Sequence, residues 1–244
     1  MDAQRMPKGT RSRSPEKKAA QFERILDAGM DLFLEKGREG FSLRGLAKNL
    51  GMNQNNLYNY VDSKRELWLA IRQKFMKQYR DENIEIIKNH KGSTVELLLK
   101  IFEHFFEFAE REPRAFQMIH ITPSPSSDKI GKFEKTYRPF NFLDGTTQVI
   151  QDAINKGEIK ETNASIFSFF LYSVILGAAI VGHSMRYREK NYLNHKTDVE
   201  ELSQFGSQNF SWKELRNYVL KKIEFELKDS NMAIEEKDYR IDKQ

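Results

Sequence analysis

Cysteine is absent from this chain of 244 residues, so disulfide bonds and thiolate chemistry are excluded. Proline and glycine are scarce, with 6 and 13 residues, and few stretches alternate apolar and polar residues as a half-buried strand would. Both features predict helices almost throughout. Phosphate-binding glycine loops, G-x-S-x-G elbows and H-E-x-x-H helices are also missing, which argues against an enzyme and gives no reason to expect a cofactor.

Clusters of metal-binding residue types are equally hard to find. The five histidines are scattered singly along the chain. His104 lies close to Glu103 and Glu107 on one predicted helix, which leaves a metal site open as an alternative. A lone histidine on a helix is more often packed or solvated, so we expect no metal ion.

Acidic residues are missing from Ser42 to Val61, a stretch that does contain Arg44 and Lys48. A surface that approaches phosphates would exclude carboxylates in this way. Gly51 is a residue type that tolerates the positive φ of a helix end. The apolar positions on either side of it predict two short helices, and the second, from about Asn53 to Tyr60, is rich in Asn and Gln. This pattern is typical of a helix-turn-helix. The alternative is an ordinary pair of packed helices in an all-α protein.

The flanking segments favour the helix-turn-helix. Residues 22–37 read FERILDAGMDLFLEKG and residues 57–67 read LYNYVDSKREL. With the motif between them they resemble the N-terminal domain of TetR-family transcriptional regulators, although Val61 stands where the family usually has Phe. The resemblance covers about residues 22–71. It implies an all-α fold in which an N-terminal three-helix DNA-binding domain precedes a C-terminal helical domain for ligand binding and dimerisation.

The resemblance also implies which residues contact double-stranded DNA. Asn53, Gln54, Asn55 and Asn59 occupy the base-reading positions, and Asn and Gln can pair with adenine in the major groove. The implied or candidate contacts to the DNA backbone are Ser42, Arg44, Tyr58, Tyr60 and Lys64. A homodimer would place two such surfaces on a near-palindromic operator, about one helical turn apart.

Composition and helix-starting signals divide the chain into four expected segments. These are a basic, disordered arm (1–15), the helix-turn-helix domain (16–62), the helical ligand-binding and dimerisation domain (63–228) and a polar tail (229–244). Within the first twenty residues, six basic side chains stand against two acidic ones. This basic stretch either contacts DNA or has no role, and the sequence does not decide between the two.

Ser-x-x-Glu sequences predict where three helices begin. Each can form a capping box in which the Ser hydroxyl and the Glu carboxylate satisfy backbone N–H groups at the helix start. A further helix is expected from Pro113, another from about Asp128 with an interruption at Pro139, and a polar loop over 193–209. The three capping boxes pair Ser63 with Glu66, Ser93 with Glu96, and Ser211 with Glu214.

An uncharged stretch from Thr162 to Met185 is long enough to cross a bilayer. Its several Ser residues, an Asn and a His, and the lack of a second such stretch, favour the centre of a helical bundle instead. The resemblance implies that this helix (162–187) and the one after Ser211, helices 8 and 9 in the expected order, form the homodimer interface. We therefore expect a cytoplasmic protein without a membrane segment.

Aromatic residues are abundant in the expected second domain and suggest a large apolar small-molecule effector, such as a lipid or acyl compound. The alternative is that they fill a core, in which case the protein would bind DNA under the control of a partner protein or of its own abundance. The candidate ligand-binding residues are Phe75, Phe102, Phe105, Phe106, Phe116, Phe133, Tyr137, Phe140, Phe169 and Tyr172.

Overall fold

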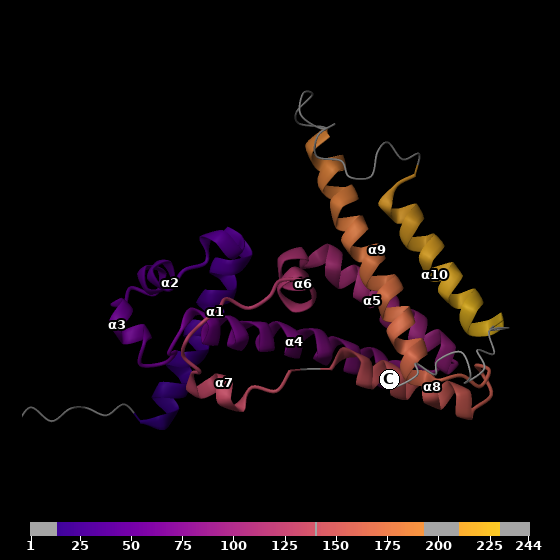
Figure 1. The fold of residues 1–244 in the computed structure, drawn as a ribbon, viewed down its shortest axis with the longest axis horizontal. Coiled ribbons are helices and arrows are strands. Elements are labelled where there is room, and N and C mark those ends of the chain that lie inside the picture. The colour runs from indigo at the N-terminus through magenta and orange to yellow at the C-terminus, as the bar shows by residue number, and fades with distance from the viewer. Residues whose placement is uncertain (1–13, 140, 193–209, 230–244) are drawn as a thin grey trace, which may run out of the picture. The chain divides into compact units, whose positions relative to one another are not determined.

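The computed structural model describes residues 14–139, 141–192 and 210–229, which fold into ten helices (Figure 1). This confirms the all-α fold class. The expected loop over 193–209, most of the basic arm and most of the polar tail lie outside the described residues. The helices are α1 (Pro15–Gly40), α2 (Leu43–Asn49), α3 (Gln54–Leu57), α4 (Lys64–Asn89), α5 (Thr94–Arg111), α6 (Pro113–His120), α7 (Lys132–Thr136), α8 (Phe142–Asn155), α9 (Ala164–Tyr192) and α10 (Trp212–Asp229).

Two compact units make up the chain. Unit 1 comprises residues 1–75 and 122–138, and unit 2 comprises residues 76–121 and 139–244. The chain therefore passes between the units three times, after residues 75, 121 and 138, and α4 belongs to both. Residues 122–138, which the sequence assigned to the second domain, group with the helix-turn-helix instead. We call this segment the strap.

The core of unit 1 is built around the buried indole of Trp68 on α4. Phe33 from α1 meets this ring edge-on with 5.2 Å between centroids, and Phe41, just before α2, does so at 5.9 Å. Edge-to-face aromatic contacts favour one defined packing arrangement. The helix-turn-helix is thus fixed on a support made of α1 and the first half of α4.

Local signals place the first helix ends as expected. Ser14 and Ser42 cap α1 and α2 with their hydroxyl oxygens, and Gly51 takes a φ of +63° after α2. Because α1 begins at Pro15, Lys17 and Lys18 lie within this helix, beyond the basic arm expected over 1–15. Prolines are favoured at the first position of a helix, and the helix begins at one here, ahead of these lysines.

The start of α4 differs from the expected capping box. Ser63 does accept a hydrogen bond from the backbone N–H of Glu66, at 3.0 Å. The Glu66 carboxylate, however, accepts from the backbone N–H of Asp62 at 2.5 Å and from that of Phe133, in the strap, at 2.6 Å. The glutamate therefore joins two segments that are far apart in sequence.

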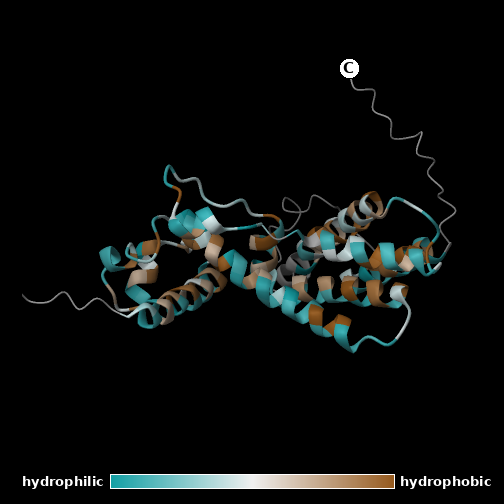
Figure 2. Ribbon diagram, turned by 90° about the horizontal axis from the view of Figure 1, so that it is seen from below, coloured by the Kyte–Doolittle hydropathy of each residue, from teal (hydrophilic) through white to brown (hydrophobic). Residues whose placement is uncertain are grey.

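At the centre of unit 2, α5 packs against α8, α9 and α10. Ribbons coloured by hydropathy show that the helices carry both apolar and polar residues, as expected of elements with one buried face (Figure 2). The Ser93–Glu96 capping box of α5 forms as predicted. Ser211 and Glu214 likewise exchange hydrogen bonds at the start of α10, and Pro139 separates α7 from α8.

One helix of the described residues, Ala164–Arg186 within α9, is long and apolar enough to span a membrane. Length and composition alone do not separate a membrane span from a core helix. Here α9 packs against α5, α8 and α10, yet it leaves one apolar side uncovered, with Phe169 62% exposed. On α10, Ile223 is buried, whereas Tyr218 is 60% exposed.

The carboxylate of Glu158, after α8, caps the start of α5. It accepts hydrogen bonds from the backbone N–H of Thr94 at 2.6 Å, from its hydroxyl at 3.0 Å and from the backbone N–H of Val95 at 3.1 Å. Desolvation opposes ionisation, but these hydrogen bonds prevail and lower the pKa of Glu158 below its usual value. The charged carboxylate is therefore the form that stabilises unit 2.

Replacing Glu158 with glutamine should lower the free energy of unfolding at pH 7 by about 0.5–1 kcal/mol, the scale of a partly exposed helix cap. A carboxylate with a lowered folded pKa stabilises above its unfolded pKa, about 4.3, and loses that contribution as the pH falls through the folded value. The difference between wild type and variant should thus shrink below about pH 4. Urea unfolding at several pH values measures it, with Glu161→Gln as the charge-matched control. An equal loss in both variants would contradict the capping role.

Candidate DNA-binding surface

The helix-turn-helix of unit 1 presents a polar face without carboxylates. Ser42 opens α2, where its oxygen accepts from the N–H of Gly45 at 3.1 Å, so its hydroxyl proton stays available to an acceptor. Arg44, in the first turn of α2, is exposed. The apolar side of α2 buries Leu43 and Leu46 in the core. Sequence periodicity therefore assigned the inner and outer faces of α2 correctly.

The second helix of the motif is shorter than expected and bears the amide cluster. It spans Gln54–Leu57 and continues as turns through Tyr60, whereas the sequence predicted a helix from about 53 to 60. Asn53 caps it, accepting from the backbone N–H of Asn55 at 2.9 Å. Leu57 is fully buried, which fixes the helix and turns the amides outward.

The amide side chains expected to read bases differ in whether they already form hydrogen bonds within the protein. Asn53 is occupied as a cap, and Gln54 donates to the hydroxyl of Tyr58 at 3.4 Å. Asn55 and Asn59 are both exposed. Within the described residues the Asn55 side-chain amide has no hydrogen-bond partner, so its donor and acceptor are free for a base edge.

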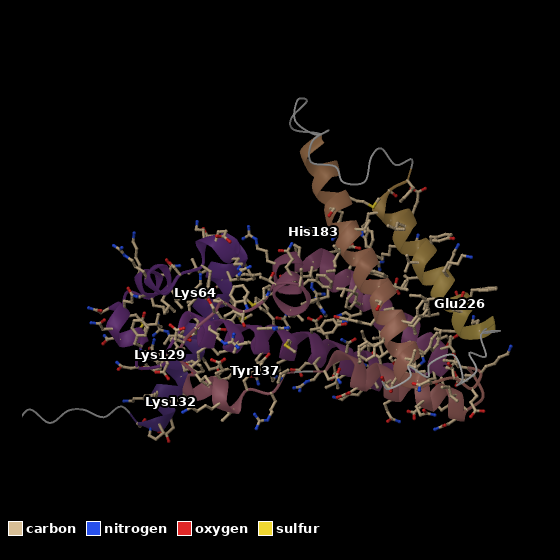
Figure 3. All side chains as sticks on the ribbon, in the orientation of Figure 1. Lys64, Lys129, Lys132, Tyr137, His183 and Glu226 are labelled. Carbon is tan, nitrogen blue, oxygen red and sulfur yellow. The ribbon has the colours of Figure 1, made fainter. Side chains whose placement is uncertain are left out.

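The expected backbone contacts lie on the same unit. Tyr58 is 45% exposed beside the amides, and Tyr60 is partly exposed. Lys64 opens α4, with its ammonium 5.8 Å from the ring centroid of Phe41, and is labelled within unit 1 in Figure 3. The structure thus places these residues on one unit.

A hollow of about 690 Å³ lies beside the amide cluster and adds residues that the sequence did not single out. Its lining combines Asn53, Asn56 and Asn59 with Lys18 and Arg24 from α1. The basic surface next to α3 therefore extends onto α1. The spacing of six residues between these two cations along α1 is not that of neighbouring side chains on a helix, so helical periodicity does not group them.

The candidate ligand-binding residues do not all lie in one unit, and they differ in burial. Phe102, Phe105, Phe106 and Phe116 are buried in unit 2, where Phe106 packs against Trp212. The rest are placed as follows: Phe75, Phe133 and Tyr137 lie in unit 1, Phe169 is exposed on α9, Tyr172 is partly exposed on α9, and Phe140 lies outside the described residues.

Polar side chains accompany part of this aromatic cluster, and the sequence did not indicate them. The hydroxyl of Tyr172 lies 3.0 Å from Nδ1 of His120, whose ring packs edge-on against Phe105 and tilted against Phe116. One turn earlier on α6, the Gln117 side-chain amide lies within hydrogen-bond distance of Nε2 of His183 on α9, at 3.1 Å. Burial, together with the charge of a nearby arginine, lowers the pKa of His183, so its neutral form is favoured.

His104 does not form the metal site considered as an alternative. Its ring bonds Glu82 at 2.8 Å and Asn83 at 3.2 Å, while Glu103 and Glu107 lie near Arg216. Across residues 14–139, 141–192 and 210–229, no three His, Asp or Glu side chains come together as metal ligands.

Comparison with known proteins identifies a family that this chain resembles. Residues 25–71 match the family model described as "Bacterial regulatory proteins, tetR family". The chain is 28% identical over 110 residues to the "Biofilm operon icaADBC HTH-type negative transcriptional regulator IcaR" of Staphylococcus aureus, covering 44% of this chain and 58% of that protein. The match thus spans less than two thirds of that relative's length.

Two further proteins extend the similarity beyond the helix-turn-helix. The "Fatty acid metabolism regulator protein" of Bacillus subtilis is 26% identical over 147 residues, covering 59% of this chain and 73% of that protein. The structure of a Clostridium perfringens "putative fatty acid metabolism regulator" superposes with a TM-score of 0.53 at 18% identity, over 84% of this chain and 96% of that one. The fold is therefore shared along most of the chain.

Proposed function

Because this chain belongs to the TetR family of transcriptional regulators, we propose that it is a homodimeric repressor that binds a near-palindromic operator and leaves it when an apolar ligand binds. The carboxylate-free face of α2 and α3, with its exposed amides, is the observation that carries the proposal. Phosphates approach such a face without repulsion, and free amides can read adenine. The repressor role follows the relative named as a negative regulator.

Dimerisation is supported by the uncovered side of α9. Ile166, Phe170, Gly177 and Ile180 are exposed and recur along the helix at nearly the spacing of successive turns. An apolar stripe of this kind is costly to leave in water. A second copy of the chain, packing α9 and α10 against their counterparts, would cover it and set two α3 helices on one duplex.

The ligand class rests on unit 2 and on one relative. Four buried phenylalanines provide apolar contacts, while His120 and Tyr172 provide polar groups beside them. A long acyl compound with a polar end matches that combination, and a relative is named for fatty acid metabolism. The polar end would hydrogen-bond to the His120–Tyr172 pair.

Selection of genomic fragments by the purified protein tests DNA binding. The expected result is a short family of fragments that share an inverted repeat and bind more tightly than scrambled duplexes of equal length. Affinity should fall steeply with salt, because phosphate contacts release counterions. Recovery of fragments without a common sequence would contradict sequence-specific regulation.

Asn55→Ala should relax the operator preference by about 1–3 kcal/mol for each bidentate hydrogen-bonded pair that it removes, at one pair of symmetric positions. The reason is that the Asn55 amide is exposed and free, whereas Asn53 is occupied as a cap. Gln54→Ala should act similarly at a neighbouring position. Fluorescence anisotropy with operators substituted base by base measures the change.

Tyr58→Phe serves as the matched control for this series. Removal of a hydroxyl that contacts phosphate should weaken all duplexes alike and leave the preference intact. If the Asn55 variant also keeps the full wild-type preference, the amide cluster is structural and the assignment of base contacts is wrong.

A further inference from the structure

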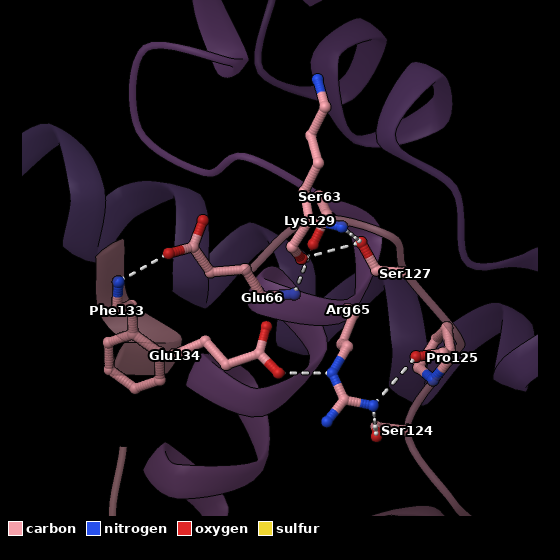
Figure 4. Close-up of polar contacts among 9 residues, drawn as sticks. All are labelled: Ser63, Arg65, Glu66, Ser124, Pro125, Ser127, Lys129, Phe133 and Glu134. Atoms are coloured by element: carbon pink, nitrogen blue, oxygen red, sulfur yellow. Dashed lines mark hydrogen bonds and ion pairs between the residues drawn. The ribbon is translucent and has the colours of Figure 1, made fainter. Parts of the chain in front are cut away.

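The strap is held on the first turn of α4 by two consecutive residues (Figure 4). Glu66 accepts from the backbone N–H of Phe133 at 2.6 Å. Arg65 pairs through Nε with Glu134 at 2.5 Å and donates through a terminal nitrogen to the Ser124 hydroxyl at 2.9 Å. These contacts all lie within unit 1, so they fix the strap relative to the helix-turn-helix.

Burial makes this attachment specific. Glu66 is 1% exposed, and the Glu134 side chain is 12% exposed. A Cβ atom on the buried Gly131 would lie 2.1 Å from the Glu66 carboxyl carbon. The strap backbone can therefore approach the Glu66 carboxylate this closely only because residue 131 is glycine. The strap is therefore seated at a defined place and is not merely a connection between α6 and α8.

Two lysines flank the seated glycine. Lys129 and Lys132 are both exposed, and neither forms an ion pair with a carboxylate in the described part of the chain. Over residues 122–138, four basic side chains stand against two acidic ones, and one of the two, Glu134, is already paired with Arg65. The strap thus offers uncompensated positive charge.

The seat of the strap adjoins a residue expected to contact DNA. Lys64 immediately precedes Arg65 and Glu66, the two residues that hold the strap. Figure 3 labels Lys64, Lys129 and Lys132 within unit 1, the unit that also carries α3. Because the strap is held by the two residues that follow Lys64, a duplex that meets Lys64 would also come near the strap.

We propose that Lys129 and Lys132 bind backbone phosphates of the operator, next to those reached by Lys64. The inference rests on the proposed function, because it assigns a further contact to the same DNA-binding surface. The strap would make the bound segment of duplex longer than the helix-turn-helix alone can cover. Since phosphates carry no sequence information, these lysines add affinity and salt dependence but not base preference.

The double variant Lys129→Gln/Lys132→Gln tests the proposal in the full-length protein. The probe is the operator duplex recovered by genomic selection, titrated at several salt concentrations. The slope of log affinity against log salt should become shallower by about 0.9 for each phosphate contact removed, or about 3.6 for both lysines of a dimer. The preference over a scrambled duplex should be unchanged.

Lys91→Gln/Lys100→Gln is the control, since it removes the same charge from exposed positions of unit 2. It should keep the wild-type slope. An equal fall in both double variants would overturn the proposal in favour of a general charge effect, and an unchanged slope in the strap variant would overturn it outright. Wild-type protein that retains no duplex would instead overturn the proposed function, and this inference with it.

Discussion

Gly177→Leu should separate the dimer and lower operator affinity by at least about 100-fold, the usual scale of removing the second of two linked binding sites. Gly177 is exposed on the apolar stripe of α9, and a Cβ atom placed there would meet nothing within 4 Å in its own chain. The protomer can therefore accept leucine. A second copy packed closely on α9 could not, because overpacking a tight seam forces its helices apart.

Gly182→Ala is the contrasting variant on the same helix. A Cβ atom at this position would lie 2.3 Å from the Trp212 ring of α10, so even one methyl group disturbs the packing inside the protomer. The alanine variant should lose thermal stability, whereas the leucine variant should keep its helical circular dichroism and become monomeric by light scattering. A Gly177→Leu protein that stays dimeric, with full operator affinity, would contradict the proposed interface.

Short-range signals account for what the sequence predicted well. The hydroxyls of Ser42 and Ser93 act on residues within one turn, so their caps could be recognised from spacing alone. The residues proposed to bind DNA also fall almost wholly within one contiguous motif. Buried neighbours such as Leu57 determine which way these side chains face. Helical periodicity in the sequence identifies the buried neighbours.

Long-range contacts account for what could not be predicted. Glu66 reads as half of a capping box, yet its carboxylate binds a backbone group of the strap, and no local pattern signals that choice. Similarly, Phe75, Phe106, Phe133 and Phe169, all proposed for one ligand site, lie in helices. Periodicity does not distinguish the exposed Phe169 from Phe106, which packs on the Trp212 indole. It also does not show that Phe133 groups with unit 1.

The proposed control by a ligand would act through the chain segments that connect the two units. The first half of α4 supports the helix-turn-helix and its second half belongs to unit 2, while the strap is joined at both ends to unit 2 and seated on Arg65 and Glu66. A ligand that changes the packing of α6 in unit 2 would therefore act on α4 and the strap together. Two α3 helices on half-sites of fixed spacing tolerate little displacement.

The expected result is mutual weakening of acyl ligand and operator by about 5–150-fold, equivalent to a coupling of about 1–3 kcal/mol. Linkage requires the same factor in both directions, because one free-energy difference couples the two sites. Fatty acids and acyl-CoA thioesters of increasing chain length would be titrated calorimetrically against the protein alone, with operator duplex and with scrambled duplex. Only the operator should lower ligand affinity.

Tyr172→Phe, which removes the hydroxyl beside His120, should lower the affinity for the ligand and leave operator affinity unchanged. Equal ligand affinities with and without operator would rule out release by a ligand and favour control by a protein partner or by abundance.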